Sequence, residues 1–465
     1  PPCSTLTLEA AGLVVCPGFI DIHSHSDFTP LVDPRACSSI AQGVTTELVG
    51  NCGHGCAPIL DPQLAPTCIY GYHPSVPITW SDFAGYFERL ERARPAINLL
   101  TLVPNGQLRS AVLGTAERPA TADERRQMVR YLEIGLDQGA FGFSTGLEYP
   151  TERATNQDDL ITLCKILARR DGLYAPHVRN RDNRAIEAID EELATARIST
   201  VRIHIPHLVP RSAGPLDTAS IALEHIDAAL RAGIDLSIDM HTRPFGLTNL
   251  NVALPPSALD GGSEKLRRLL KDPAARRAFA ERPNMLMSYS LSGWDHVKVL
   301  TSARRPDLIG KSFAQIAEAA GVSPFDAVLD LLWEEADDPY YPLVLCEAHT
   351  EDQMQQTFQH PACMVGSDAT ALCPDGPLAG QIFHGAYTWV SWFLRRMVRE
   401  RKALTLPAAI KKMTSQPAER IGLRDRGLLR IGNWADIAVF DPATFADRGT
   451  ITVSYTHLRA HETPE

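Results

Sequence analysis

Two histidines separated by one residue are the first side chains whose types and spacing could support catalysis. His23 and His25 end the apolar run 18–25, which predicts a β-strand. Because alternate residues of a strand share a face, both imidazoles would point to the same side. At the carboxyl end of a barrel strand, that side could hold a metal ion. A pair of buried core histidines is the alternative interpretation.

Other side chains able to bind a metal or transfer a proton stand at the ends of later predicted strands: Cys52, His177, His207 and Asp368. Imidazoles that converge from several strands on one mouth suit Zn²⁺ or a similar metal. A thiolate is also a strong zinc ligand, although a lone cysteine is more often a small buried apolar side chain. Asp368 could bind metal or accept a proton from water.

An arginine near one of these histidines could bind substrate. Arg179 lies two residues after His177, so a continuing strand would present both on one face. Its guanidinium could hold a carboxylate through two parallel hydrogen bonds. A surface ion pair is the alternative.

A competing signal is the G-x-S-x-G pattern at 142–146, which is the nucleophile elbow of serine hydrolases. That elbow requires a helix directly after its serine. Here Leu-Glu-Tyr follows and then Pro150, which excludes a continuing helix. A serine hydrolase built on Ser144 is therefore the weaker alternative.

Short apolar strands that alternate with amphipathic helices would position these side chains, a pattern typical of a parallel α/β fold. One helix begins at Thr121, with Glu124 three residues later as a capping box, and stops at Gly139. More than six alternations without a dinucleotide-binding glycine fingerprint favour a closed TIM-like (β/α)8 barrel over an open sheet. The predicted strands are 18–25, 45–50, 98–103, 141–145, 173–179, 201–207, 235–240, 285–289, 343–347 and 364–367.

The chain divides into unequal parts by pattern. We expect a barrel at 16–422 with a charged helical insertion near 255–282 that could act as a lid. Short strands at 427–430 and 436–440 suggest a small β module at 423–452, with a remnant of the same module at 1–15. The last thirteen residues, 453–465, resemble a translated adapter and are excluded from the fold.

Composition excludes several classes of protein. The net charge is −10 and no dense Lys/Arg block occurs, so nucleic acid is an unfavourable partner. No run of about 18 apolar residues suggests a membrane span. Ten scattered cysteines favour a reduced compartment such as the cytoplasm. Arginine outnumbers lysine by 37 to 8, and the first lysine is Lys165.

With these residues in hand, the chain resembles the amidohydrolase superfamily and, within it, the N-acyl-D-amino-acid deacylases (D-aminoacylases). The resemblance covers almost the whole chain and is carried by several motifs in family order. They are PGFIDIHSHSD, QGVTTELVGNCG, FGFSTGLEYP, LYAPHVRN, IPHL, MVGSDA and KKMTSQPAERIGLRDRGLLRIGNWADIAVFDP.

The resemblance implies a zinc site of one or two ions. His23 and His25 would hold one metal position, and His177 and His207 the other, with the Cys52 thiolate shared between them. Asp368 would be the catalytic carboxylate. Related cyclic-amide hydrolases, the hydantoinases and dihydroorotases, bridge their metals with a carbamylated lysine. That bridge is unavailable on the first four strands of this chain, because no lysine precedes Lys165.

The resemblance also implies the substrate, a small N-acyl-D-amino acid whose amide bond is hydrolysed. Arg179 would bind the free carboxylate and impose the D preference, and Arg243 and Tyr149 would be further substrate contacts. Three alternatives stay open: a cyclic-amide hydrolase, a serine hydrolase and an inactive barrel that serves as a binding scaffold.

Overall fold

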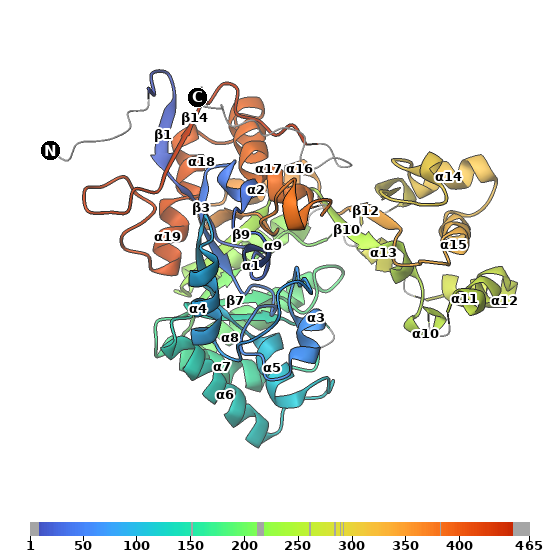
Figure 1. Ribbon diagram of the computed structural model, residues 1–465, viewed down its shortest axis with the longest axis horizontal. Helices are drawn as coiled ribbons and strands as arrows, with labels where there is room; N and C mark the ends of the chain where they lie inside the picture. Colours follow the sequence, from blue (N-terminus) through green and yellow to red (C-terminus); the bar gives the residue numbers. More distant parts are fainter. Residues whose placement is uncertain are drawn as a thin grey trace.

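Helices and short strands alternate along most of the chain in the computed structural model (Figure 1). The predicted adapter tail, and residues 1–8 of the predicted N-terminal remnant, lie outside the residues that the structure describes. The described residues are 9–149, 152–211, 218–259, 262–282, 285–288, 290–291, 293–381 and 383–449.

Parallel strands form two sheets at the centre of the molecule. They are β2 (Phe19–Asp21), β3 (Val44–Val49), β4 (Asn98–Thr101), β5 (Val103–Pro104), β6 (Gly142–Gly146), β7 (Leu173–His177), β8 (Arg202–Ile205), β9 (Leu236–His241) and β13 (Cys363–Gly366). One sheet has the order β2-β3-β4 and the other β13-β9-β8-β7-β6-β5. The predicted parallel α/β class is confirmed. The described strands form two separate parallel sheets, so their hydrogen bonds do not close into one barrel.

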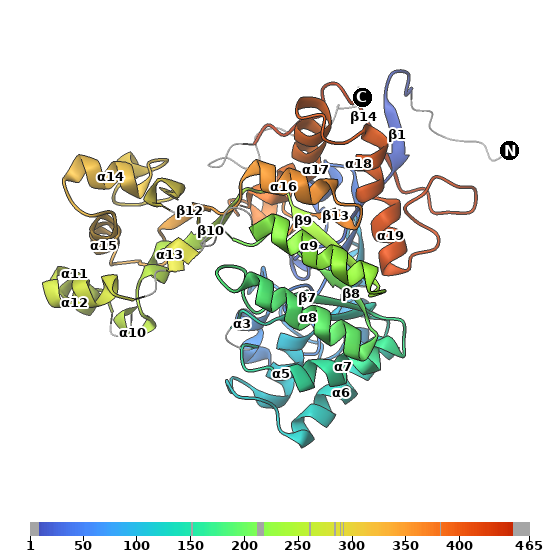
Figure 2. The ribbon, with the colours of Figure 1, turned by 180° about the vertical axis from the view of Figure 1, so that it is seen from behind.

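Amphipathic helices pack around these sheets (Figure 2). The predicted capping box at Thr121 is confirmed: the Thr121 Oγ1 accepts from the Glu124 N–H at 3.3 Å, and the Glu124 carboxylate accepts from the Thr121 N–H at 2.8 Å. The helices are α4 (Phe83–Ala93), α5 (Asn105–Leu113), α6 (Ala122–Asp137), α7 (Gln157–Ala168), α8 (Ala185–Ser199), α9 (Thr218–Arg231), α16 (Glu351–Gln359), α17 (His384–Phe393), α18 (Leu406–Lys412) and α19 (Ser415–Ile421).

Shorter helical segments complete this part of the molecule. They are α1 (Thr29–Val32), α2 (Cys37–Ile40), α3 (Ala65–Cys68), the 3₁₀ turns η1 (Pro62–Leu64) and η5 (Gly376–Leu378), and the π-helix η6 (Leu394–Glu400), which continues α17. Among the described residues, no helix combines the length and apolar character needed to cross a membrane.

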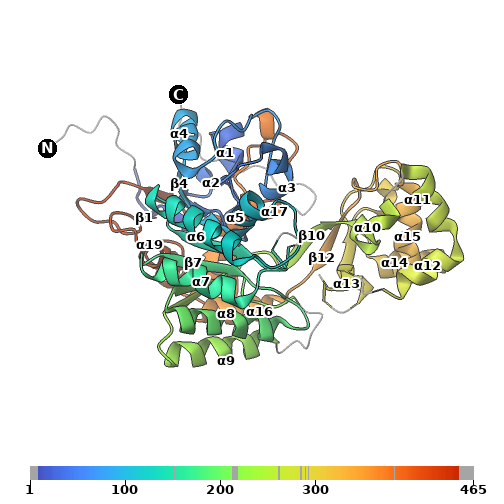
Figure 3. The same ribbon diagram turned by 90° about the horizontal axis from the view of Figure 1, so that it is seen from below.

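The described residues between 245 and 347 form a separate lobe, here called the insertion lobe, which projects from one side of the molecule (Figure 3). Its buried side chains form their own apolar core, which includes Leu266, Phe313 and Val328. The predicted insertion at 255–282 is part of this larger lobe. The lobe contains β10 (Phe245–Asn249), η2 (Leu250–Ala253), α10 (Pro256–Leu259), α11 (Gly262–Lys271), α12 (Pro273–Ala280), α13 (Met285–Ser288), η3 (Trp294–His296), β11 (Val297–Val299), η4 (Pro306–Leu308), α14 (Phe313–Ala320), α15 (Pro324–Glu334) and β12 (Leu343–Glu347).

Two predicted strands in this region need correction. The segment 285–288 is the helix α13, because a short apolar run such as Met-Leu-Met has no period that separates helix from strand. Residue 289 lies outside the described residues. The strand 343–347 exists as β12, but it pairs antiparallel with β10 and β11 inside the insertion lobe.

The small β module is reduced to two strands among the described residues. β1 (Val14–Pro17) pairs antiparallel with β14 (Ile437–Phe440). The strand predicted at 427–430 is wrong, since these residues form bends and coil. Gly427 has φ +78°, a left-handed conformation that extended strands do not use.

Candidate metal centre

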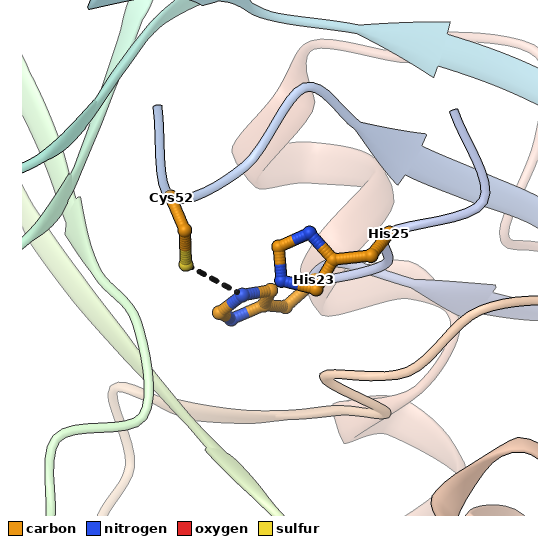
Figure 4. Close-up of side chains that lie close together, drawn as sticks. All are labelled: His23, His25 and Cys52. Atoms are coloured by element: carbon orange, nitrogen blue, oxygen red, sulfur yellow. Dashed lines mark hydrogen bonds between the residues drawn. The ribbon is translucent and has the colours of Figure 1, made fainter. Parts of the chain in front are cut away.

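Five predicted metal ligands converge where the parallel strands end. His23 and His25 lie just beyond β2, His177 is the last residue of β7, and Cys52 and His207 follow β3 and β8. All five side chains are buried. Figure 4 shows His23, His25 and Cys52 directed toward one another.

The donor atoms of these residues form two groups that share the thiol. Those of His23, His25 and Cys52 lie within 4.8 Å of one another, and so do those of Cys52, His177 and His207. The Cys52 Sγ lies 3.4 Å from His23 Nε2 and 3.5 Å from His207 Nε2. His207 Nε2 lies 3.0 Å from His177 Nδ1. One sulfur therefore stands between two pairs of imidazoles.

Electrostatics favours the metal-binding forms of Cys52 and His207. Burial raises the pKa of the Cys52 thiol, but the His23 and His177 imidazoles outweigh it and hold that pKa well below its usual value. Burial and the nearby Arg181 guanidinium lower the pKa of His207 to about 3. Burial lowers the pKa of His23, His25 and His177, but the Cys52 thiolate and the neighbouring carboxylates outweigh it and raise the pKa of all three, so a metal ion would have to displace a proton from these imidazoles. A thiolate and neutral imidazoles are the ligating forms. The buried N and S donors therefore fit zinc.

Asp368 lies beside this cluster. Its Oδ1 is 3.3 Å from His25 Nε2 and 3.6 Å from His23 Nε2, and its Oδ2 accepts from the Arg243 guanidinium at 3.2 Å. Burial raises the pKa of Asp368, but these neighbours outweigh it and hold the pKa well below its usual value. An ionised carboxylate thus faces the donor atoms.

Three of these residues have left-handed backbone conformations. The φ angles are +53° at Cys52, +38° at His207 and +46° at Asp368. Such angles are rare for residues other than glycine, cost about 1–3 kcal/mol each and concentrate at functional sites. At each position the chain turns sharply after its strand, which directs the side chain into the cluster.

A buried carboxylate that the sequence analysis missed orients one histidine. The Asp239 Oδ2 on β9 lies 3.2 Å from His23 Nδ1 and 2.9 Å from His204 Nε2. Its Oδ1 accepts from the His207 backbone N–H at 2.7 Å. This arrangement leaves His23 Nε2 directed at Cys52. The sequence signal that could have indicated Asp239 is the alternation of polar residues along β9, at Ser237, Asp239 and His241.

Glu148 has a comparable role at His177. Its Oε2 lies 3.0 Å from His177 Nε2, and its other oxygen pairs with Arg211. The opposite nitrogen of His177 is thereby turned toward His207 and Cys52. No pattern in the sequence distinguished Glu148 from a surface carboxylate.

Two adjoining cavities of about 320 and 240 Å³ open beside the cluster. Both are lined by Asp368, Tyr149 and three arginines, Arg181, Arg211 and Arg243. Gly246 and Leu247 of β10 line both as well, so the stem of the insertion lobe forms part of the wall.

Two predicted substrate contacts lie in this wall. The Tyr149 ring packs 4.9 Å from the His177 ring, centroid to centroid. The Arg243 guanidinium donates to the carbonyl oxygens of Ser367 and Asp368, both at 2.8 Å, and its carbon lies 4.7 Å from the centroid of the Phe383 ring. Gly385 leaves room for Arg243, because a Cβ there would overlap the guanidinium.

Arg179 is not brought into these cavities. Its guanidinium forms two hydrogen bonds with Glu191, each 2.9 Å, and donates to the backbone carbonyls of Arg153 and Thr155. The expected face-sharing with His177 fails because β7 ends at His177, so the strand alternation does not reach position 179. Arg179 instead forms an ion pair with Glu191, which was the alternative interpretation of this residue.

Ser144 does not have the surroundings of a nucleophile. It lies buried within β6, donates its hydroxyl to the carbonyl of Gly50 and accepts from the Gly53 N–H at 3.2 Å. No helix directly follows the serine, as an elbow requires.

Comparison with known proteins gives matches over nearly the whole chain. A model of a family described as the amidohydrolase family matches residues 7–197 and 314–459. The N-acyl-D-glutamate deacylase of Alcaligenes xylosoxydans xylosoxydans is 34% identical over 448 residues, which are 95% of this chain and 80% of that protein. The D-aminoacylase of the same organism is 29% identical over 95% of this chain and 81% of its own length.

Solved structures of deacylases also match this chain over nearly its whole length. The N-acyl-D-glutamate deacylase of Bordetella bronchiseptica, complexed with zinc and a phosphonate inhibitor that mimics the tetrahedral intermediate, has a TM-score of 0.74. It is 29% identical, and the match covers 96% of this chain and 83% of that one. A D-aminoacylase structure has a TM-score of 0.72 at 28% identity, with the same coverage.

Proposed function

The chain belongs to the amidohydrolase family, and from this premise we propose that it hydrolyses the amide bond of N-acyl-D-amino acids. The products would be a carboxylate and a free D-amino acid. The observation that carries the proposal is the shared thiol: Cys52 stands between two histidine pairs, with an ionised Asp368 at their side. Relatives named N-acyl-D-glutamate deacylase, N-acyl-D-aspartate deacylase and D-aminoacylase support the substrate class.

We propose that zinc is the cofactor, as one or two ions. His23 and His25 would hold one position, His177 and His207 the other, and the Cys52 thiolate would serve both. Bound zinc supplies a Lewis acid for the amide carbonyl and lowers the pKa of a bound water. The buried N and S donors and the zinc in a solved relative support this choice.

Asp368 would carry the proton. Its ionised carboxylate, held by Arg243 next to His25, can accept a proton from the attacking water. Returning that proton to the leaving nitrogen completes the cleavage of the amide bond. Asp368→Asn, which keeps the shape of the side chain but removes the base, should lose about 10²-fold to 10⁴-fold in rate.

Tyr149 and Arg243 are proposed as contacts of the bound substrate. Both line the two cavities, and the Tyr149 ring packs directly against the ring of His177. Arg243 is also bonded to the backbone of Asp368, so it would couple substrate binding to the position of that carboxylate.

We infer that the two parallel sheets form one (β/α)8 barrel. β4 and β5 are separated only by Leu102 and can be counted as one interrupted strand. At the other junction, a parallel bridge joins Ser24 and Ala369, and the Asp368 N–H donates to the His23 carbonyl at 2.8 Å. The strand ends that bear the ligands would then surround one mouth.

The experiment is a substrate panel assayed with zinc-loaded protein. We expect release of acetate from N-acetyl-D-methionine, N-acetyl-D-glutamate or N-acetyl-D-aspartate, and little from the L enantiomers. Ring opening of hydantoins without turnover of any N-acyl-D-amino acid would instead favour the cyclic-amide hydrolase. Loss of all activity in Ser144→Ala, with the fold and zinc retained, would favour the serine hydrolase.

A further inference from the structure

One arginine of the cavity wall has almost no partner in the part of the chain that the structure describes. The Arg181 side chain lies two residues beyond the predicted carboxylate-binding Arg179 and is only 8% exposed. Among the described residues, its guanidinium makes one hydrogen bond, a 2.9 Å donation to the His207 carbonyl, and no carboxylate lies within ion-pair distance. A guanidinium has five N–H donors, so most of those of Arg181 are unused.

The other two cavity arginines are already engaged. Arg211 pairs with Glu148, and Arg243 bonds to the carboxylate and backbone of Asp368. Arg179 is outside the cavities and bound to Glu191. Arg181 is therefore the arginine of the wall with no carboxylate in direct contact among the described residues, although the charges of Glu148 and Asp368 act on it from farther away.

A buried guanidinium without a directly bonded carboxylate is unfavourable, and a ligand carboxylate can supply that partner. Burial disfavours the charged state of Arg181, and the like charge of the nearby Arg211 adds to this cost. A carboxylate that enters the cavity would relieve both effects and could accept two parallel hydrogen bonds from the guanidinium.

We propose that Arg181 binds a carboxylate of the substrate and thereby orients the scissile amide over the cluster. This inference rests on the proposed function. The hydrogen bond to the His207 carbonyl holds the guanidinium beside a metal-ligand residue, so its free donors have a fixed position relative to the reacting bond. Every N-acyl amino acid offers an α-carboxylate, and acidic ones offer a second carboxylate on the side chain.

The test compares two substrates that differ in one charge. N-acetyl-D-glutamate has two carboxylates, while N-acetyl-D-glutamine has the α-carboxylate alone and nearly the same shape. Each is assayed with wild type, Arg181→Gln and Arg181→Lys, with zinc content and melting temperature measured on the same samples. Arg184→Gln is the matched control, because it removes the same charge at an exposed position, where Arg184 pairs with the exposed Glu187.

We expect Arg181→Gln to raise KM by about 10- to 100-fold with a smaller change in kcat, as for loss of a charge-assisted pair. Arg181→Lys should recover part of this loss, and Arg184→Gln should behave as wild type. A rise in KM for both substrates identifies the α-carboxylate, and a rise for N-acetyl-D-glutamate alone identifies the side-chain carboxylate.

An unchanged KM for both substrates in Arg181→Gln, with zinc content and melting temperature retained, would overturn the inference. If Arg181→Gln does not fold, Arg181→Lys decides, and an unchanged KM there has the same meaning, because an ammonium cannot reproduce the planar fork. Failure of wild type on every N-acyl-D-amino acid would instead contradict the proposed function, so the two failures are distinguishable.

Discussion

At the scale of single residues, hydrogen bonds from two carboxylates fix the direction of two of the proposed ligands, His23 and His177. Asp239 and Glu148 accept from, or share a proton with, the nitrogens of His23 and His177 that face away from Cys52. Carboxylates behind metal-binding histidines fix the ring tautomer and increase ligand basicity. The donor geometry therefore depends on residues that need not contact metal or substrate.

Asp239→Asn tests this dependence. The amide retains the shape of the carboxylate but not its charge, so His23 should be held less firmly and zinc should bind about 10- to 100-fold more weakly. The measurement is the zinc dissociation constant, by competition with a chromophoric chelator. Asp190→Asn is the control, because Asp190 is exposed on α8 and pairs with His225, which is not one of the proposed ligands. Equal affinity in Asp239→Asn and wild type would show that Asp239 does not act through His23.

The sequence predicted the five donors and Asp368 because each has a side chain able to bind metal or transfer a proton, and each stands at or just after the end of a strand. Arg181 could not be predicted, since its direction depends on how the chain turns after β7 ends at His177. Asp239 was also missed. It lies inside a strand, and only the structure shows that this strand faces His23.

At the scale of elements, the insertion lobe contributes to the site through its first strand. β10 leaves the parallel sheets next to Arg243 and presents Gly246 and Leu247 to both cavities. A Cβ added at Gly246 would meet no atom within 4 Å, so a larger side chain at this position has free space in front of it. The lobe thus limits the volume left for the substrate.

Gly246→Phe should narrow that space without disturbing the strand. For a substrate with a long acyl chain we expect KM to rise at least about tenfold, while N-acetyl substrates change less, because even one misplaced methylene costs about 1–3 kcal/mol and tenfold corresponds to about 1.4 kcal/mol. Steady-state kinetics on an acyl-length series measures this, with Gly246→Ala as the conservative control. An equal effect on all acyl lengths would argue against a role of β10 in the wall.

Elements with strong local signals were predicted well, as at α6, where the capping box and the apolar face agree. Errors fell on short apolar runs. Met-Leu-Met at the start of α13 fits a helix as well as a strand, and the segment 427–430 has no partner strand in the described part of the chain. Pairing between distant segments, such as β10 with β12, cannot be read from local periodicity.

At the scale of the whole molecule, a buried acid links stability to pH. Glu192 on α8 is buried and accepts from the Tyr174 hydroxyl at 2.8 Å. Burial, with the charge of Glu191, raises the pKa of Glu192 to about 8. Between the unfolded pKa of about 4.3 and this folded value, the folded state keeps a proton that the unfolded state loses, so stability falls as pH rises.

Glu192→Gln should remove this dependence, because glutamine imitates the protonated acid. At pH 5 the variant and wild type should have similar free energies of unfolding. At pH 8 the variant should be more stable by roughly 3–4 kcal/mol, since each pH unit between 5 and 8 costs wild type up to about 1.4 kcal/mol. Chemical denaturation at both pH values measures the difference. A difference that does not grow between pH 5 and pH 8 would contradict the assignment.

The parallel α/β class could be predicted from the alternation of strands and helices. The position of the candidate metal centre could be predicted from the polar residues at the strand ends. The extent of the insertion lobe could not, because its boundaries at β10 and β12 are set by long-range pairing and by an apolar core separate from that of the sheets.

The most direct test of the central claim is the rate of N-acetyl-D-glutamate hydrolysis as zinc is returned to metal-free protein. We predict no turnover without metal, a rate that rises with bound zinc to one or two ions per chain, and little turnover of the L enantiomer at any point. Full activity in metal-free protein, or equal rates for the two enantiomers, would contradict a zinc-dependent deacylase of N-acyl-D-amino acids.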